Sequence, residues 1–302
     1  MKQFDRREFL KSVGLLSSYG LLSGIFEPLT SLGQAPIFKK DLFFKISLAE
    51  WSLHKALQGK VLDHLDFPAK AKKDFDISAV EYVNQFFKDK ATDFNYLKKL
   101  KRRCDDHGVS SVLIMIDNEG HLADLDTTKR LQAVKNHYKW ADAATFLGCH
   151  SIRVNCYGEG NPEEVAKAGA DGLHKLSEYA QTVGINVIVE NHGGISSNGK
   201  WLSRVIKDVN ISNCGTLPDF GNFCIRSEKK ETGEICVEQY DRYTGVTEMM
   251  PFAKGVSAKS YDFDSRGNCI ETDYEKMLSI VKSAGYKGHI GIEECTTVLQ
   301  LV

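Results

Sequence analysis

From about residue 44 onward, short apolar runs that end in polar residues alternate with longer stretches whose apolar positions recur at helical spacing. The apolar runs are predicted strands, covering residues 44–51, 79–84, 111–117, 151–156, 186–191, 215–219, 255–260 and 289–293. The amphipathic stretches between them are predicted helices, covering residues 93–107, 126–147, 162–183, 201–209 and 273–284. This alternation is typical of βαβ units and a parallel sheet.

Glycine follows several of the predicted helices, at Gly108, Gly148, Gly184 and Gly285. Glycine in this place ends a helix because it adopts the left-handed conformation without strain. Eight strands, most of them followed by a helix, fit a closed (β/α)8 TIM barrel better than an open sheet, since closure leaves no edge strands. We expect one barrel domain over residues 40–302, with an eighth helix that is short or missing and an N-terminal segment covering the gap.

The N-terminus has the layout of an export signal. Arg6 and Arg7 precede Phe9, and a short apolar stretch follows over residues 13–26. This pattern resembles a twin-arginine signal, which predicts that residues 1–35 direct the protein to the periplasm and that no stable membrane span remains after processing. Cleavage after Ala35 stays open because a proline follows it, and an N-terminal anchor helix is the alternative.

Charge and motifs exclude several classes of partner. The chain has 39 basic and 40 acidic residues and a pI near 6.8, so we expect no nucleic-acid partner. Glycine-rich dinucleotide and P-loop motifs are absent from the sequence. The eight cysteines are scattered without a C-x-x-C pair, which argues against a zinc finger and leaves disulfides undecided.

Carboxylates end three of the predicted strands: Glu190 the fifth, Asp219 the sixth and Glu293 the eighth. In a barrel, the carboxyl ends of the strands meet at the mouth that carries the active site. Acids gathered there are costly to desolvate alone and therefore imply a cation. Oxygen ligands favour magnesium, manganese or calcium. The alternative is that each acid caps a helix or lies on the surface.

Other polar residues fall at the same strand ends. His192 follows Glu190 by two and is a candidate ligand, proton shuttle or substrate donor, or a histidine that only holds its loop. Lys259, inside the seventh strand, is predicted to neutralise carboxylates or polarise a carbonyl, unless it points outward. Weaker candidates for binding substrate hydroxyls are Glu50, Asn84, Asp117 and Asn155.

The motifs Val-Glu-Asn-His at 189–192, Pro-Asp-Phe-Gly-Asn at 218–222 and Gly-Ile-Glu at 291–293 resemble the xylose isomerase-like barrels. This superfamily of sugar isomerases and epimerases includes ketose 3-epimerases and endonuclease IV, and the likeness spans roughly residues 44–295. It implies a metal, manganese or magnesium, held by Glu190, Asp219, a histidine of strand seven and Glu293. Ser257 stands where that histidine is expected, and Asn222, predicted to bind substrate, where another histidine often follows.

These features predict an enzyme, a sugar isomerase or epimerase that acts on a free sugar or glycoside. Glu190 and Glu293 would exchange a proton beside a carbonyl, and a metal or Lys259 would stabilise the enediolate. Alternatives are a 3-keto-glycoside β-elimination lyase or hydrolase, a sugar-binding barrel without catalysis and, least favoured, an endonuclease. Residues 224–243 are predicted to form a loop at the mouth or a partner contact, which would allow a homo-oligomer.

Overall fold

The computed structural model describes residues 42–231 and 233–295. All eight predicted strands form, and they lie in one parallel sheet. They are β1 (Lys45–Ala49), β2 (Ala79–Val83), β3 (Ser110–Met115), β4 (Ser151–Asn155), β5 (Asn186–Glu190), β6 (Cys214–Leu217), β9 (Val256–Ser260) and β10 (His289–Glu294). Their order in the sheet is β6-β5-β4-β3-β2-β1-β10-β9.

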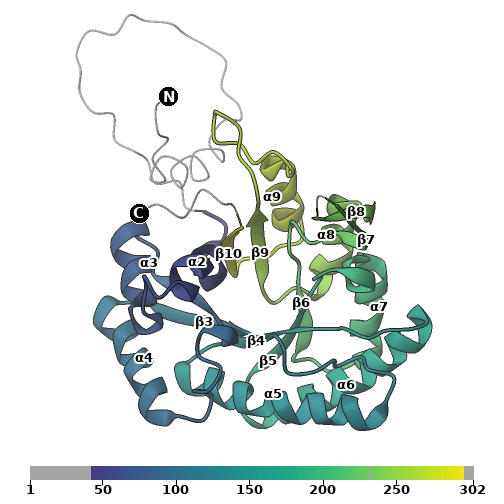
Figure 1. Cartoon of the computed structure of the whole chain (residues 1–302), viewed down its shortest axis with the longest axis horizontal. Coiled ribbons are helices and arrows are strands. Elements are labelled where there is room, and N and C mark those ends of the chain that lie inside the picture. The colour runs from purple at the N-terminus through teal and green to yellow at the C-terminus, as the bar shows by residue number, and fades with distance from the viewer. Residues whose placement is uncertain (1–41, 232, 296–302) are drawn as a thin grey trace, which may run out of the picture.

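The sheet closes on itself between β6 and β9. Isolated parallel bridges join Thr216 to Ala253 and Asp219 to Ser257. The Ser257 amide donates to the carbonyl of Pro218 at 3.0 Å, and the Phe220 amide donates to the carbonyl of Ser257 at 3.1 Å. The predicted (β/α)8 barrel is therefore confirmed, with strands inside and helices around them (Figure 1).

The helices are α2 (His54–Gln58), α3 (Phe67–Phe75), α4 (Phe94–His107), α5 (Thr127–Leu147), α6 (Pro162–Thr182), α7 (Gly199–Val209), α8 (Arg242–Met249) and α9 (Tyr274–Ser283). The five predicted helices form as α4, α5, α6, α7 and α9, whereas α2, α3 and α8 were not predicted. The glycines after α4 and α5, Gly108 and Gly148, have φ angles of 61° and 83° and end these helices as expected.

Within residues 42–295, position 232 aside, five short 3-10 helices complete the connections: η2 (Glu50–Leu53), η3 (His64–Asp66), η4 (Asn84–Phe86), η5 (Gly194–Ser197) and η6 (Met250–Phe252). After β10 no helix begins within the described residues, which end at Cys295. The predicted export signal, the segment expected to cover the barrel end and the last residues all lie outside the described part. Among the helices that are described, none combines the length and apolar character needed to cross a membrane.

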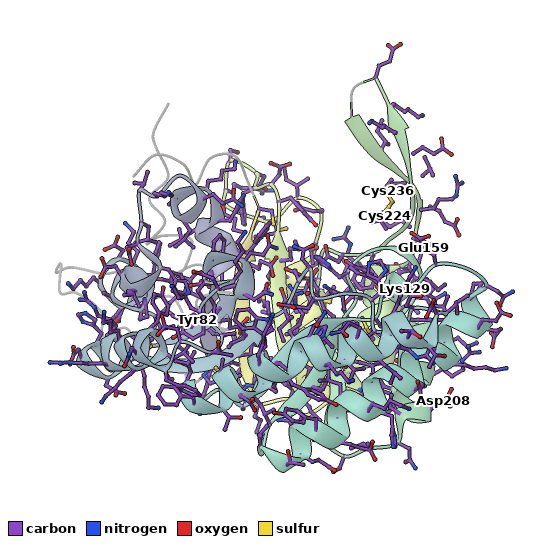
Figure 2. All side chains as sticks on the ribbon, turned by 60° about the horizontal axis from the view of Figure 1, so that its bottom comes forward. Tyr82, Lys129, Glu159, Asp208, Cys224 and Cys236 are labelled. Carbon is purple, nitrogen blue, oxygen red and sulfur yellow. A yellow bond between two sulfur atoms is a disulfide. The ribbon has the colours of Figure 1, made fainter. Side chains whose placement is uncertain are left out.

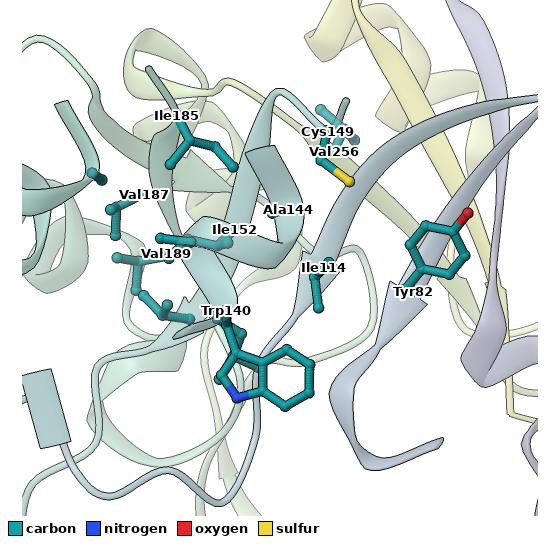
Figure 3. Close-up of a cluster of buried hydrophobic side chains, with 14 of the residues drawn as sticks. Tyr82, Ile114, Trp140, Ala144, Cys149, Ile152, Ile185, Val187, Val189 and Val256 are labelled. Atoms are coloured by element: carbon teal, nitrogen blue, oxygen red, sulfur yellow. The ribbon is translucent and has the colours of Figure 1, made fainter. Parts of the chain in front are cut away.

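The main core lies between the strands and the surrounding helices. Trp140 and Ala144 of α5 pack with Ile152 of β4 and Val187 of β5, and all four are fully buried (Figure 3). Burying a large apolar side chain stabilises a fold by about 1.5–3 kcal/mol. The Trp140 indole also donates to Glu119 at 2.6 Å, so this core supports the loop after β3.

Residues 224–239 differ from the expected loop. They form an antiparallel hairpin of β7 (Cys224–Lys230) and β8 (Gly233–Gln239), and a disulfide joins Cys224 to Cys236. The hairpin projects away from the barrel (Figure 2). It follows β6 at the carboxyl end of that strand, so it arises at the end of the barrel where active sites lie.

Candidate active site

The register of the sheet brings the predicted site residues together. Asn155 on β4 lies opposite Glu190 on β5, and Lys259 on β9 lies opposite Glu293 on β10. The bridge between β6 and β9 sets Asp219 opposite Ser257. Polar side chains from neighbouring strands therefore meet at the carboxyl end of the barrel.

The three predicted metal ligands form one buried cluster. Candidate ligand oxygens of Glu190, Asp219 and Glu293 lie within 4.8 Å of one another, and each residue is at most 3% exposed. One oxygen of Asp219, Oδ1, accepts from the amides of Gly221 and Asn222, both at 2.8 Å. The other, Oδ2, is buried and accepts no hydrogen bond from any described residue.

Lys259 points inward, as predicted, and contacts one of these acids. Its Nζ donates to Glu293 Oε1 at 2.6 Å, and the Ser257 hydroxyl donates to Oε2 at 3.3 Å. Burial raises the pKa of Glu293, but the Lys259 ammonium more than offsets this, so that pKa lies below its ordinary value. Burial opposes the charge on Lys259, but Glu293 and Asp219 outweigh it and raise the lysine pKa.

Arg153 is a central residue that the sequence reasoning missed. Its Nε lies 2.7 Å from Glu190 Oε2, and its guanidinium also donates to Asp117 Oδ1 at 2.8 Å. The Asn155 amide donates to the same Asp117 oxygen at 2.8 Å. An arginine between two apolar residues of a strand, two positions before a polar strand end, shares the face of that end. This spacing is the sequence signal from which Arg153 could have been predicted to lie at the site.

The charges of the cluster do not balance. Four carboxyl groups, Asp117, Glu190, Asp219 and Glu293, face two cations, Arg153 and Lys259, so the acidic groups outnumber the basic ones by two. Burial and the neighbouring carboxylates raise the pKa of Glu190 and of Asp219.

The residues fit a hard divalent cation. The surplus of acidic groups would be offset by such an ion, the donors are carboxylate oxygens, and the buried Asp219 Oδ2 accepts no hydrogen bond within the described structure. Ser257 contributes a hydroxyl to this cluster and no nitrogen ligand.

A cavity of about 530 Å³ opens beside this cluster. Its wall includes Trp51, Asp117, Arg153, Asn155, Tyr157, His192, Lys259 and Glu293. A volume of this size accommodates small organic ligands, including a sugar with a substituent.

His192 lines this cavity and contacts Tyr157. The Tyr157 hydroxyl donates to the backbone carbonyl of His192 at 2.6 Å and lies 2.5 Å from Nδ1 of the same residue. Burial, followed by the charges of Arg153 and Lys259, lowers the pKa of His192 to about 4. The imidazole is therefore neutral at neutral pH.

Three predicted substrate-binding residues lie away from the cavity. Glu50 is fully buried and accepts from the amide of Val83 at 2.7 Å, with its second oxygen 3.0 Å from His64. Asn84 pairs with the backbone of Asp117, so both residues hold neighbouring strands together.

Asn222, the third, donates to Glu190 Oε1 at 2.9 Å. It also accepts a hydrogen bond from Tyr261 at 3.3 Å. Asn222 therefore holds a carboxylate of the buried cluster in place.

The chain belongs to the family of xylose isomerase-like TIM barrels, whose family model matches residues 69–297. This confirms the resemblance carried by the strand-end motifs. A comparison with curated proteins finds no match.

Solved structures with the same fold include several proteins that act on sugars. D-psicose 3-epimerase from Clostridium cellulolyticum H10 aligns with a TM-score of 0.63 and 12% identity, covering 84% of this chain and 85% of its own. A 3-keto-D-glucoside 4-epimerase from E. coli aligns with a TM-score of 0.60 and 14% identity over 83% and 91% of the two chains. The IolI protein, solved with a bound zinc atom, aligns with a TM-score of 0.61 and 14% identity over 83% and 88%. At these identities the likeness establishes the fold.

Proposed function

We propose that this protein is a sugar isomerase or epimerase that moves a proton at a carbon beside a carbonyl. The observation that carries the proposal is the buried Lys259 ammonium, 2.6 Å from the Glu293 carboxylate, on the wall of a cavity. Glu190 and Asp219 lie within 4.8 Å of Glu293. A base, a proton donor and an electrophile next to one pocket are the groups that enolisation requires.

The two glutamates differ in their proton affinity, which suggests a role for each. Glu293 has a lowered pKa and is the ionised base that removes the proton from carbon. The electron pair of the broken C–H bond moves onto the carbonyl oxygen, where Lys259 donates a hydrogen bond to the enediolate. Glu190, whose pKa is raised, returns a proton to the opposite face of that carbon.

Glu190, Asp219 and Glu293 are the residues that would hold a divalent cation. When bound, such an ion supplies Lewis-acid polarisation of the substrate oxygens. Asp219 would then contribute Oδ2, while its Oδ1 stays fixed by the amides of the following turn.

The cavity favours a neutral substrate. Both cations on its wall, Arg153 and Lys259, are already paired with carboxylates. Neither cation is therefore free to pair with a phosphate group. We therefore propose a free sugar or a glycoside. The Arg6-Arg7 signal pattern supports a periplasmic location, where such substrates occur unphosphorylated.

Proton abstraction by the same base also suits β-elimination from a 3-keto-glycoside. The volume of about 530 Å³, which leaves room for an aglycone beside a sugar ring, favours this second candidate. In that reaction the electrons of the C–H bond expel the glycosidic oxygen, so the product is an unsaturated ketone.

Solvent exchange tests both reactions. The purified protein is incubated in D2O with D-fructose, D-psicose or 3-keto-glucosides, and deuterium at carbon is followed by NMR together with the products. We expect exchange with one substrate class and a loss of about a thousandfold for Glu293→Gln. Glu164→Gln, at an exposed position on α6, is the matched control and should not change the rate.

Elemental analysis of the same samples measures the cation. We expect about one magnesium or manganese per chain in the wild type and much less in Asp219→Asn. A protein that binds these sugars tightly but never exchanges their protons would be a sugar-binding barrel, and the proposal would be wrong.

A further inference from the structure

The contact between Tyr157 and His192 determines where the imidazole proton lies. A tyrosine hydroxyl has one proton, and a carbonyl oxygen is only an acceptor. The 2.6 Å contact to the His192 carbonyl therefore uses the Tyr157 proton. At the 2.5 Å contact, the Tyr157 oxygen must then accept, so Nδ1 of His192 carries hydrogen and donates it.

The other ring nitrogen is left with a lone pair. No carboxylate within the described residues forms an ion pair with His192 that would hold a second proton on the ring, so the imidazole carries a single N–H group, and here Nδ1 holds it. Nε2 has no hydrogen-bond partner among the described residues. It is also not fully buried, and His192 lines the cavity. His192 therefore presents an acceptor to a ligand.

We propose that Tyr157 is a positioning residue that fixes His192 as the Nδ1–H tautomer, so that Nε2 accepts a hydrogen bond from a substrate hydroxyl. Lys259, on the wall of the same cavity, is a donor only. An α-hydroxy carbonyl compound is then oriented with its hydroxyl toward His192 and its carbonyl oxygen toward Lys259. This orientation rests on the proposed function, whereas the tautomer does not.

The arrangement also disfavours ligands that present only acceptor atoms to His192. A carboxylate or phosphate oxygen beside Nε2 would place two acceptors together without a proton between them, which leaves a buried polar group unpaired. His192 therefore favours neutral polyols over acidic sugars. A donor tautomer would have the reverse preference.

Nitrogen NMR measures the tautomer directly. The full chain is labelled with ¹⁵N-histidine, and His192→Gln identifies the signals of His192 among the nine histidines. We expect the wild type to show the Nδ1–H pattern. Tyr157→Phe, which removes the acceptor, should show the Nε2–H form or a mixture. Tyr138→Phe, a tyrosine on α5 stacked against Tyr179 at a separate surface pocket, is the matched control and should leave the pattern unchanged.

A wild-type spectrum of the Nε2–H type would overturn the proposal, as would a Tyr157→Phe spectrum identical to the wild type. The wild-type spectrum alone shows which tautomer His192 adopts, even if Tyr157→Phe does not fold.

Ligand recognition is tested separately, by titration with D-fructose. We expect the Nε2 signal of His192 to move on binding and the dissociation constant to rise about fivefold in Tyr157→Phe, the effect of one hydrogen bond. Binding of D-fructose that leaves the His192 signal unmoved would refute the substrate contact. Neither result depends on turnover, so a failure here is distinguishable from a failure of the proposed enzyme activity.

Discussion

Glu81 on β2 is buried inside the barrel, and its replacement by glutamine should change how stability depends on pH. The Ser47 hydroxyl donates to Oε1 at 2.6 Å, while Oε2 has no hydrogen-bond partner among the described residues. Gly291, two residues before Glu293, leaves the space that the carboxyl group occupies. Burial is the main reason that the pKa of Glu81 rises to about 7 from an ordinary 4.5.

The sign and size of the effect follow from that difference. Because the folded-state pKa lies above the unfolded value, the protonated form stabilises the fold fully below pH 4.5, and this contribution is lost as the pH rises through about 7. Each pH unit over that range corresponds to 1.36 kcal/mol at most, so the loss between pH 5 and pH 8 is about 2.5 kcal/mol. Glutamine mimics the protonated form and does not titrate.

Urea unfolding of the wild type and of Glu81→Gln at pH 5 and pH 8 measures the effect. The free energy of unfolding of the variant, relative to the wild type, should be about 2.5 kcal/mol higher at pH 8 than at pH 5, which is about 7 °C in melting temperature. Titration of acids that do not interact with Glu81 is common to both proteins and cancels in this comparison. Equal differences at the two pH values would show that Glu81 does not hold a proton in the folded state.

Three further predictions use the same barrel. Gly291→Ala would place a Cβ 2.5 Å from Glu81 Oε2 and should lower the free energy of unfolding by about 1–3 kcal/mol; an unchanged urea midpoint would contradict this packing. Arg153→Met strips the buried Glu190 of its cation and should cost about 3–5 kcal/mol in the same assay, and a cost below about 1 kcal/mol would show that the pair is not buried as described. Cys236→Ser should speed proteolysis of the hairpin, where the disulfide to Cys224 limits opening, and should change the melting temperature of the barrel by only about 2 °C. Cleavage of the hairpin at the wild-type rate would contradict the last expectation.

The candidate site was only partly readable from the sequence. Glu190, Asp219 and Glu293 stand at the ends of apolar runs, and this local pattern was enough to predict that they meet at one mouth. Glu50 has the same local pattern, but its carboxylate is used inside the fold by the backbone of β2 and by His64. A strand end thus predicts that a residue is near the mouth, but not which partner it faces.

The sequence by itself determined the order of strands and helices, because apolar periodicity and glycine stops are local properties of the chain. It also determined which acids end their strands. Only the tertiary structure decided the partners: closure between β6 and β9 sets Asp219 against Ser257, and the register across β4 and β5 brings Arg153 to Glu190. Such pairs depend on contacts between residues that are distant in the chain, and therefore the proton on His192 and the charge balance of the site follow from the folded barrel alone.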